Sequence, residues 1–129
     1  MFVHASIRVS DMDNSIAFYE KFLNMKLLNR REIPENQAEI AFLQDRQAKG
    51  ALLELTFYQD QKKFIQADYE NRLFDHLAFQ VENMGKTLDA MRTQGVTITD
   101  EPYRLSPKGS LLAFIEDPDG TLIELIEKA

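Results

Sequence analysis

The chain has 129 residues, a formal net charge of -6 and no cysteine. This length allows one compact domain, or two small halves that share a core. The acidic balance argues against a general nucleic-acid binder, which needs clustered positive charge to attract phosphates. The lack of cysteine excludes disulfides, zinc–thiolate sites and a nucleophilic thiol, and it fits a cytoplasmic location. The longest apolar run, Leu111 to Ile115, is far too short to cross a bilayer, so no membrane partner is expected.

The first predicted elements are a strand that begins at His4 and a helix over residues 12–23. Apolar and polar residues alternate after His4 with the period of a half-buried strand. The helix is predicted from an apolar stripe at helical spacing. Asp11 or Asp13 can cap its first amides, and Asn24 can end it in the left-handed conformation usually given to glycine.

The remaining elements repeat this order of strand, helix and further strands. In the first half, the predicted strands after the helix are 26–29, 38–43 and 50–57. The second half begins with a strand at His76, followed by a helix that Asn83 caps and Gly95 ends. Its later strands are predicted over 96–99, 111–116 and 121–126, with a strong turn signal at Asp117-Pro118-Asp119-Gly120.

The chain repeats its own pattern at an offset of 70 to 72 residues. His4 and His76, the only two histidines, occupy equivalent positions near strand starts. Glu54 and Glu124 stand in the matching segments Leu-Leu-Glu-Leu and Leu-Ile-Glu-Leu. The pattern predicts an α+β fold of two paired βαβββ modules. We expect a single domain over residues 1–129, made of modules 1–60 and 72–129 joined by 61–71.

Four polar side chains of this repeat predict a metal site. Glu54 and Glu124 project from mainly apolar strand faces, where an unpaired carboxylate is costly. A lone His or Glu on a strand is more often structural or solvated, but here one repeat relates both histidines and both glutamates. If the modules pair about a pseudo-twofold axis, the four side chains converge. Two imidazoles and two carboxylates suit a divalent ion such as Ni, Co, Zn, Mn or Fe, and positions left open for substrate would make the centre catalytic.

Several stretches of the chain carry a family resemblance: His4 to Val9, Ser15-Ile16 with Phe18-Tyr19, Leu23 with Met25 to Leu28, Leu53 to Thr56, and Ala113 to Gly120 through Ile123 to Leu125. On these residues the sequence resembles the glyoxalase I (lactoylglutathione lyase) family of the vicinal-oxygen-chelate superfamily, nearly end to end. The resemblance implies one divalent ion per site, with Ni or Co favoured and Zn also considered. Its implied ligands are His4, Glu54, His76 and Glu124.

The resemblance also implies a reaction and its participants. The hemithioacetal of methylglyoxal and glutathione would be isomerised to lactoylglutathione through a metal-stabilised enediolate. Glu124 would be the catalytic base, and Glu54 a ligand and a second candidate for proton transfer. Arg8 would hold the glutathione carboxylate and Lys108 would approach the substrate from a loop; the residues alone also allow an ordinary surface arginine and loop lysine. Family members usually form homodimers with the site at the interface, in which one chain would supply His4 and Glu54 and the other His76 and Glu124.

Departures from the family pattern leave alternatives open. Tyr58 stands where the family commonly has an asparagine that contacts glutathione, so another thiol or another small oxygen chelate is an alternative. Methylmalonyl-CoA epimerases typically have glutamine where Glu54 stands, and extradiol dioxygenases and fosfomycin-resistance proteins lack an acidic residue there. A non-catalytic binding module would generally have lost the ligands. The sequence leaves open which metal binds, which thiol takes part and whether two chains share one site.

Overall fold

The computed structural model describes residues 1–60 and 64–129, so residues 61–63 of the predicted connector lie outside the described part. The chain divides into two compact units, Met1–Ile65 and Gln66–Ala129. The boundary between them falls inside the predicted connector, residues 61–71. Among the described helices, none is long and apolar enough to span a membrane.

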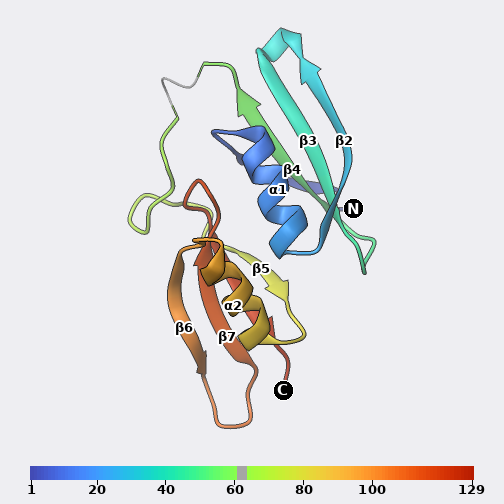
Figure 1. The fold of residues 1–129 in the computed structure, drawn as a ribbon. Helices are drawn as coiled ribbons and strands as arrows, with labels where there is room; N and C mark the ends of the chain where they lie inside the picture. Colours follow the sequence, from blue (N-terminus) through green and yellow to red (C-terminus); the bar gives the residue numbers. More distant parts are fainter. Residues whose placement is uncertain (61–63) are drawn as a thin grey trace. The chain divides into compact units, whose positions relative to one another are not determined.

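The first unit is a four-stranded mixed sheet with a helix on one face (Figure 1). Its elements are β1 (His4–Arg8), α1 (Met12–Phe22), β2 (Met25–Ile33), a short 3-10 helix (Pro34–Asn36), β3 (Ala38–Asp45) and β4 (Leu52–Tyr58). The strand order is β1-β4-β3-β2, with β1 parallel to β4 and the other pairs antiparallel. The first and last strands of the unit therefore lie side by side.

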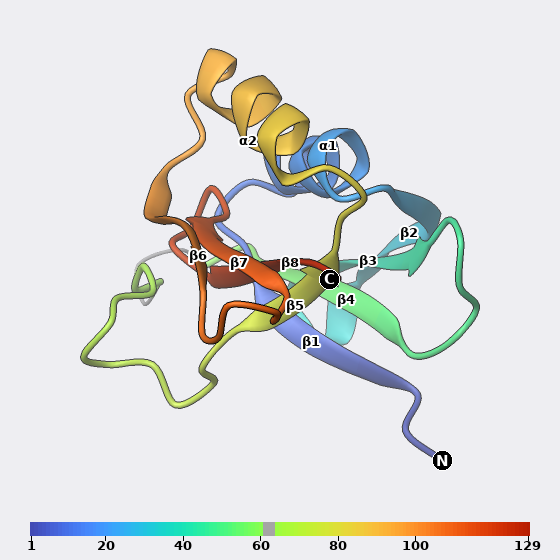
Figure 2. The same cartoon turned by 90° about the horizontal axis from the view of Figure 1, so that it is seen from below.

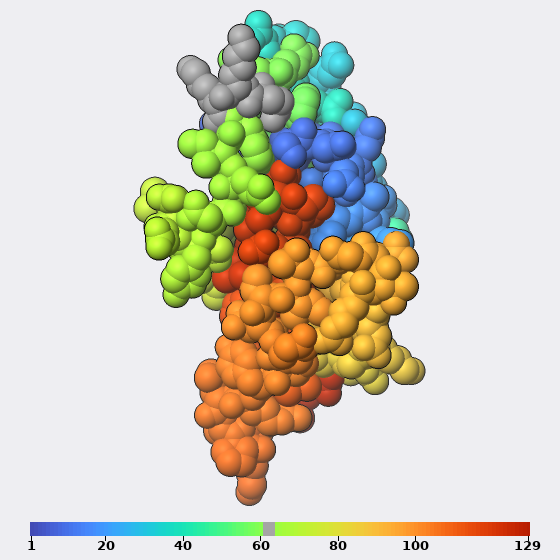
Figure 3. All heavy atoms as spheres, turned by 60° about the vertical axis from the view of Figure 1, so that its left-hand side comes forward, coloured from blue at the N-terminus to red at the C-terminus, as the bar shows by residue number. Residues whose placement is uncertain are grey.

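The second unit repeats this topology. Its elements are β5 (Leu77–Gln80), α2 (Met84–Thr93), β6 (Ile98–Arg104), β7 (Leu111–Glu116) and β8 (Leu122–Glu127). The strand order is β5-β8-β7-β6, again with the first strand parallel to the last. The loop between β6 and β7 forms a protruding tip of this unit (Figure 3). Two βαβββ units confirm the predicted α+β fold class.

The helices begin and end at the residues that the sequence indicates. The side chain of Asp11 accepts a hydrogen bond from the amide of Asn14, and that of Asn83 accepts one from the amide of Lys86, each over 2.9 Å. These bonds satisfy amides that a helix start leaves without an intrahelical partner. Past the helix ends, Asn24 (φ 54°) and Gly95 (φ 77°) adopt the left-handed conformation, as predicted.

In each unit the helix covers one face of its own sheet (Figure 2). The side chains beneath it alternate along the strands and are almost completely buried; they include Leu43, Leu55, Ile115 and Leu125. Neighbouring residues of a strand point to opposite faces. Glu54, beside Leu55, and Glu124, beside Leu125, therefore lie on the sheet face turned away from the helix.

β3 exceeds its predicted range by two residues, and two other strands differ from theirs by more. β2 covers Met25–Ile33 instead of 26–29, and β6 covers Ile98–Arg104 instead of 96–99. Both are edge strands whose outer residues are mostly exposed, so they carry no alternation of buried and exposed side chains. Backbone pairing with β3 and β7 extends them instead. A smaller difference concerns His76, which lies immediately before β5 and not within it.

Two glycines with positive φ differ in the space around them, so substituting each separates the cost of backbone strain from the cost of a steric clash. Gly95 and Gly120 both have positive φ, but a Cβ atom would meet nothing within 4 Å at Gly95 and the Ala67 carbonyl oxygen at 2.5 Å at Gly120. We expect Gly95→Ala to lower the free energy of unfolding by about 1 kcal/mol and Gly120→Ala to lower it by clearly more. Gly50→Ala, with neither feature, should stay within about 0.5 kcal/mol of the parent. Urea unfolding measures all three, and equal losses for Gly95→Ala and Gly120→Ala would contradict this account.

Candidate metal centre

The first histidine–glutamate pair lies on the parallel strands β1 and β4. His4 Nε2 is 3.0 Å from Glu54 Oε2. The ladder pairs His4 with Leu52 and Ser6 with Glu54, so both side chains project from the same face of the sheet. The Glu54 side chain is only 14% exposed, whereas that of His4 is 39% exposed. The ring of Phe42, on β3, meets the imidazole edge-on at 5.3 Å between centroids.

The second pair reproduces this arrangement in the second unit. His76 Nε2 is 3.2 Å from Glu124 Oε2, and the Glu124 side chain is 17% exposed. Phe114 meets the imidazole edge-on at 5.6 Å between centroids. Phe42 and Phe114 are themselves 72 residues apart, so the repeat extends to the aromatic wall beside each imidazole.

Both pairs have donor atoms that fit a divalent cation. An imidazole nitrogen this close to a carboxylate oxygen requires a proton between them or a cation bound to both. Imidazole nitrogen and carboxylate oxygen are ligands that borderline divalent ions accept. Within the described residues, no group of three or more His, Cys, Asp or Glu side chains could hold a metal ion. The structure thus brings the four predicted ligands together as two pairs, one in each unit, and the convergence of all four stays a prediction.

Two hydroxyl groups lie in a chain of hydrogen bonds that ends at the carboxylate of the first pair. Thr56 Oγ1 donates to Glu54 Oε1 over 3.1 Å, so the two carboxylate oxygens have different partners. Ser6 Oγ lies 2.8 Å from Thr56 Oγ1. A hydroxyl has one proton, and that of Thr56 is used toward Glu54, so Ser6 is the donor in this second bond. The result is a short chain of hydrogen bonds that runs from Ser6 through Thr56 to Glu54.

The second pair is held at its imidazole instead. His76 Nδ1 lies 2.6 Å from Asp75 Oδ1, while Nε2 faces Glu124. A carboxylate at one ring nitrogen fixes the orientation of the imidazole and leaves the other nitrogen for a ligand contact. Asp75 is 82% exposed, so this contact orients the ring more than it stabilises the fold.

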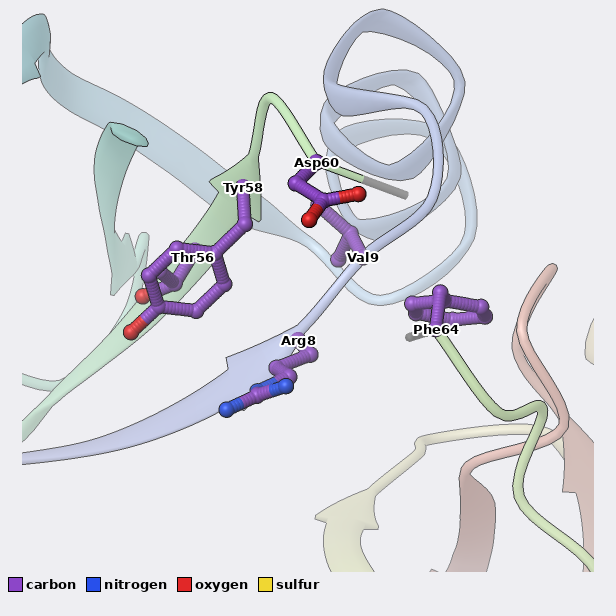
Figure 4. Close-up of a pocket in the computed structure, with 6 residues that line it drawn as sticks. All are labelled: Arg8, Val9, Thr56, Tyr58, Asp60 and Phe64. Carbon is purple, nitrogen blue, oxygen red and sulfur yellow. The ribbon is translucent and has the colours of Figure 1, made fainter. Parts of the chain in front are cut away.

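Arg8, a predicted substrate contact, lies on the same face of β1 as His4 and Ser6. Its guanidinium carbon is 4.7 Å from the centre of the Tyr58 ring. Arg8 and Tyr58, together with Val9, Thr56, Asp60 and Phe64, line a small hollow (Figure 4). Its free volume of about 10 Å³ is close to the space that one water molecule needs. The ring of Tyr58 therefore covers one face of the guanidinium, although Arg8 as a residue is exposed.

Lys108, the other predicted substrate contact, is exposed in the loop between β6 and β7. In the described part of the chain, no hydrogen bond or ion pair joins it to His76 or Glu124. Its role in substrate binding stays a prediction.

Three residues beside the two pairs, Ser6, Thr56 and Asp75, are not among the site residues predicted from the sequence. Strand alternation places Ser6 on the face of His4 and Thr56 on the face of Glu54, and this signal was available. The register that puts Ser6 opposite Glu54 cannot be read from the sequence, because it depends on how two strands distant along the chain pair. Asp75 lies before a strand, where alternation indicates nothing about its direction.

Comparison with known proteins matches residues 1–125 to the model of the Glyoxalase/Bleomycin resistance protein/Dioxygenase superfamily. A lactoylglutathione lyase of Escherichia coli O157:H7 is 36% identical over 128 residues, which cover 98% of this chain and 91% of that protein. One of Arabidopsis thaliana is 34% identical over 129 residues, covering 98% of this chain and 44% of the relative. The crystal structure of glyoxalase I from Zea mays matches with a TM-score of 0.80 and 30% identity, over 99% of this chain and 44% of that one. The chain thus spans less than half the length of these plant proteins and about nine-tenths of the bacterial one.

Proposed function

The chain belongs to the Glyoxalase/Bleomycin resistance protein/Dioxygenase superfamily, and we propose that it acts as a glyoxalase I-type lyase. The substrate would be the hemithioacetal of methylglyoxal and a thiol, with glutathione as the first candidate thiol. The observation that carries the proposal is the repeated histidine–glutamate pair, with nitrogen–oxygen distances of 3.0 and 3.2 Å. Glu54 favours this reaction over those of relatives that lack an acidic residue at its position.

His4, Glu54, His76 and Glu124 would hold one divalent ion, with nickel or cobalt as the first choice and zinc as the next. Such an ion, when bound, would polarise the two neighbouring oxygens of the hemithioacetal and acidify the adjacent C–H bond. The aromatic rings of Phe42 and Phe114 lie against the imidazoles and restrict their rotation. Asp75 fixes the orientation of His76 from the opposite ring nitrogen.

Glu124 is the proposed base. Its carboxylate would take the proton from the carbon that bears sulfur and return it to the neighbouring carbonyl carbon, so that a hydroxy ketone becomes a hydroxy thioester with no net gain or loss of atoms. The proposal is supported by the burial of this carboxylate, which is only 17% exposed, and by its contact with His76 at 3.2 Å.

Arg8 would bind a carboxylate of the thiol. In the structure its guanidinium lies under the ring of Tyr58 and beside the hollow that Asp60 and Phe64 also line. The ring covers one face of the guanidinium, whose N–H donors point outward from its edge, so a carboxylate can approach Arg8 from that edge. Tyr58, in place of the family's asparagine, favours a second candidate, namely the same isomerisation with a thiol other than glutathione.

The site would be shared between two copies of the chain. Each unit contributes one pair, and in the described residues neither unit by itself assembles three ligands. In a homodimer, His4 and Glu54 of one copy would join His76 and Glu124 of the other. The plant relatives, of which this chain covers less than half, have the length for two such sets in one chain.

Metal and thiol dependence give the first test. Protein stripped with a chelator should lose methylglyoxal isomerisation, and Ni²⁺, Co²⁺ or Zn²⁺ should each restore it to a different degree. Parallel assays with glutathione, cysteine, coenzyme A and no thiol should show activity only with a thiol present. The formation of thioester is followed by its ultraviolet absorbance. Inactivity with every combination of metal and thiol would overturn the proposed function.

The base assignment has its own test. Glu124→Gln should lower kcat by about a thousandfold or more, because the amide cannot accept the proton. Glu82→Gln, at an exposed site outside the helices and strands, is the matched control and should leave kcat within about twofold of the parent. Equal kcat values for Glu124→Gln and Glu82→Gln would remove Glu124 from this role.

Subunit complementation tests whether the site is shared. One variant carries His4→Ala with Glu54→Gln, and the other carries His76→Ala with Glu124→Gln. Each should be inactive alone. When the two are co-expressed with different tags and the mixed dimer is isolated, a shared arrangement leaves one of its two sites intact and should restore about half of the parent activity per dimer. A mixed dimer without activity would place each site within one chain.

A further inference from the structure

The two repeats differ in what surrounds their carboxylates. Glu54 has Thr56 two residues later and Ser6 opposite it on β1, and both hydroxyls are hydrogen-bonded toward it. The repeat-equivalent positions around Glu124 hold Ala78 and Ile126, which have no polar side-chain atoms. Within the described part of the chain, the Glu124 side chain makes its hydrogen-bonding or charged contact with His76 alone. The carboxylate of Glu54 is therefore held by hydrogen bonds from hydroxyl groups, a tether that the equivalent carboxylate of Glu124 does not have in the described structure.

The tether restricts Glu54 in a specific way. Its Oε1 accepts from Thr56 while Oε2 faces His4, so rotation of the carboxylate breaks one contact or the other. Thr56 is itself only 8% exposed and, being β-branched, has a restricted side-chain rotamer. Ser6 donates to the Thr56 hydroxyl from the neighbouring strand and so orients the proton of Thr56 toward Glu54.

We propose that Ser6 and Thr56 are positioning residues that keep Glu54 a fixed metal ligand, and that the lack of equivalent hydroxyls around Glu124 leaves that carboxylate free to leave the metal and move a proton. The inference rests on the proposed function, because it concerns how the two carboxylates divide ligation and proton transfer. A carboxylate pre-set by hydrogen bonds loses less freedom when it binds a cation, so the tether raises the affinity for the ion. A carboxylate that must alternate between two positions moves more easily when no such hydrogen bonds hold it.

The first experiment measures metal affinity, not activity. Thr56→Val keeps the branched shape but removes the hydroxyl, and it should weaken Ni²⁺ or Co²⁺ binding about tenfold in a chelator competition. Ser6→Ala, which removes only the outer bond, should weaken it about threefold. Thr56→Ser retains a hydroxyl and should recover most of the parent affinity. The urea unfolding midpoint of each metal-free variant shows that the affinity change is not a loss of fold.

The second experiment moves the tether to the other carboxylate. Ala78→Ser combined with Ile126→Thr places a serine and a threonine around Glu124 at the positions equivalent to Ser6 and Thr56. This double variant should lower kcat about tenfold while its metal affinity stays equal to or above that of the parent. The matched control is Ala78→Ser with Ile126→Val, which has the same branched shape at that position without the hydroxyl, and its kcat should stay near that of the parent.

The outcomes separate this inference from the function on which it rests. If the parent chain binds no divalent ion, the proposed function itself fails. If the parent binds the ion and Thr56→Val binds it equally well, the tether has no role in ligation and the inference is overturned. Equal kcat values for the double variant with Ile126→Thr and its control with Ile126→Val would overturn the claim that Glu124 needs freedom of movement.

Discussion

A carboxylate on an inner strand, with most of its surface covered, must meet a cation or hydrogen-bond donors, and both units are arranged to meet this requirement. β4 and β8 each have neighbours on both sides, and each carries one such glutamate on the face away from the helix. In each unit a histidine from the first strand or the residue before it lies beside this charge: His4 is on β1, and His76 immediately precedes β5. The parallel pairing of the first and last strands therefore positions the histidine beside the glutamate in each unit.

The sequence predicted the parts of this arrangement that depend on local pattern. The matching apolar segments of the repeat identified the strands that carry Glu54 and Glu124, and the caps Asp11 and Asn83 located the helix starts. The lengths of β2 and β6 were underestimated, because edge strands with mostly exposed residues show no alternation of buried and exposed side chains. The repeat indicated the His–Glu pairs before any strand order was known.

What the sequence could not supply is the register between strands distant along the chain. Ser6 faces Glu54 only because β1 and β4 pair in that register, and a shift by one residue would turn the serine to the other face. The contact of Asp75 with His76 depends on the conformation of a segment outside regular structure. The two carboxylates differ because Glu54 has hydroxyl-bearing neighbours and Glu124 has not. A comparison of only the residues that are identical in the two repeats does not reveal this difference.

β1 and β5 lie at sheet edges, and this placement affects how easily each unit unfolds locally. Within the described residues, each of these strands is paired on one side only. The contact of His4 with Glu54 joins β1 to its inner neighbour, and that of His76 with Glu124 joins the start of β5 to its inner neighbour. A ligand held by both members of such a contact binds only while the edge strand stays in place. By mass action it stabilises that state by about 2.7 kcal/mol at a hundredfold excess over its Kd. Occupancy would thus lower the population of the state in which the first strand is detached, and with it the exposure of this strand to proteases.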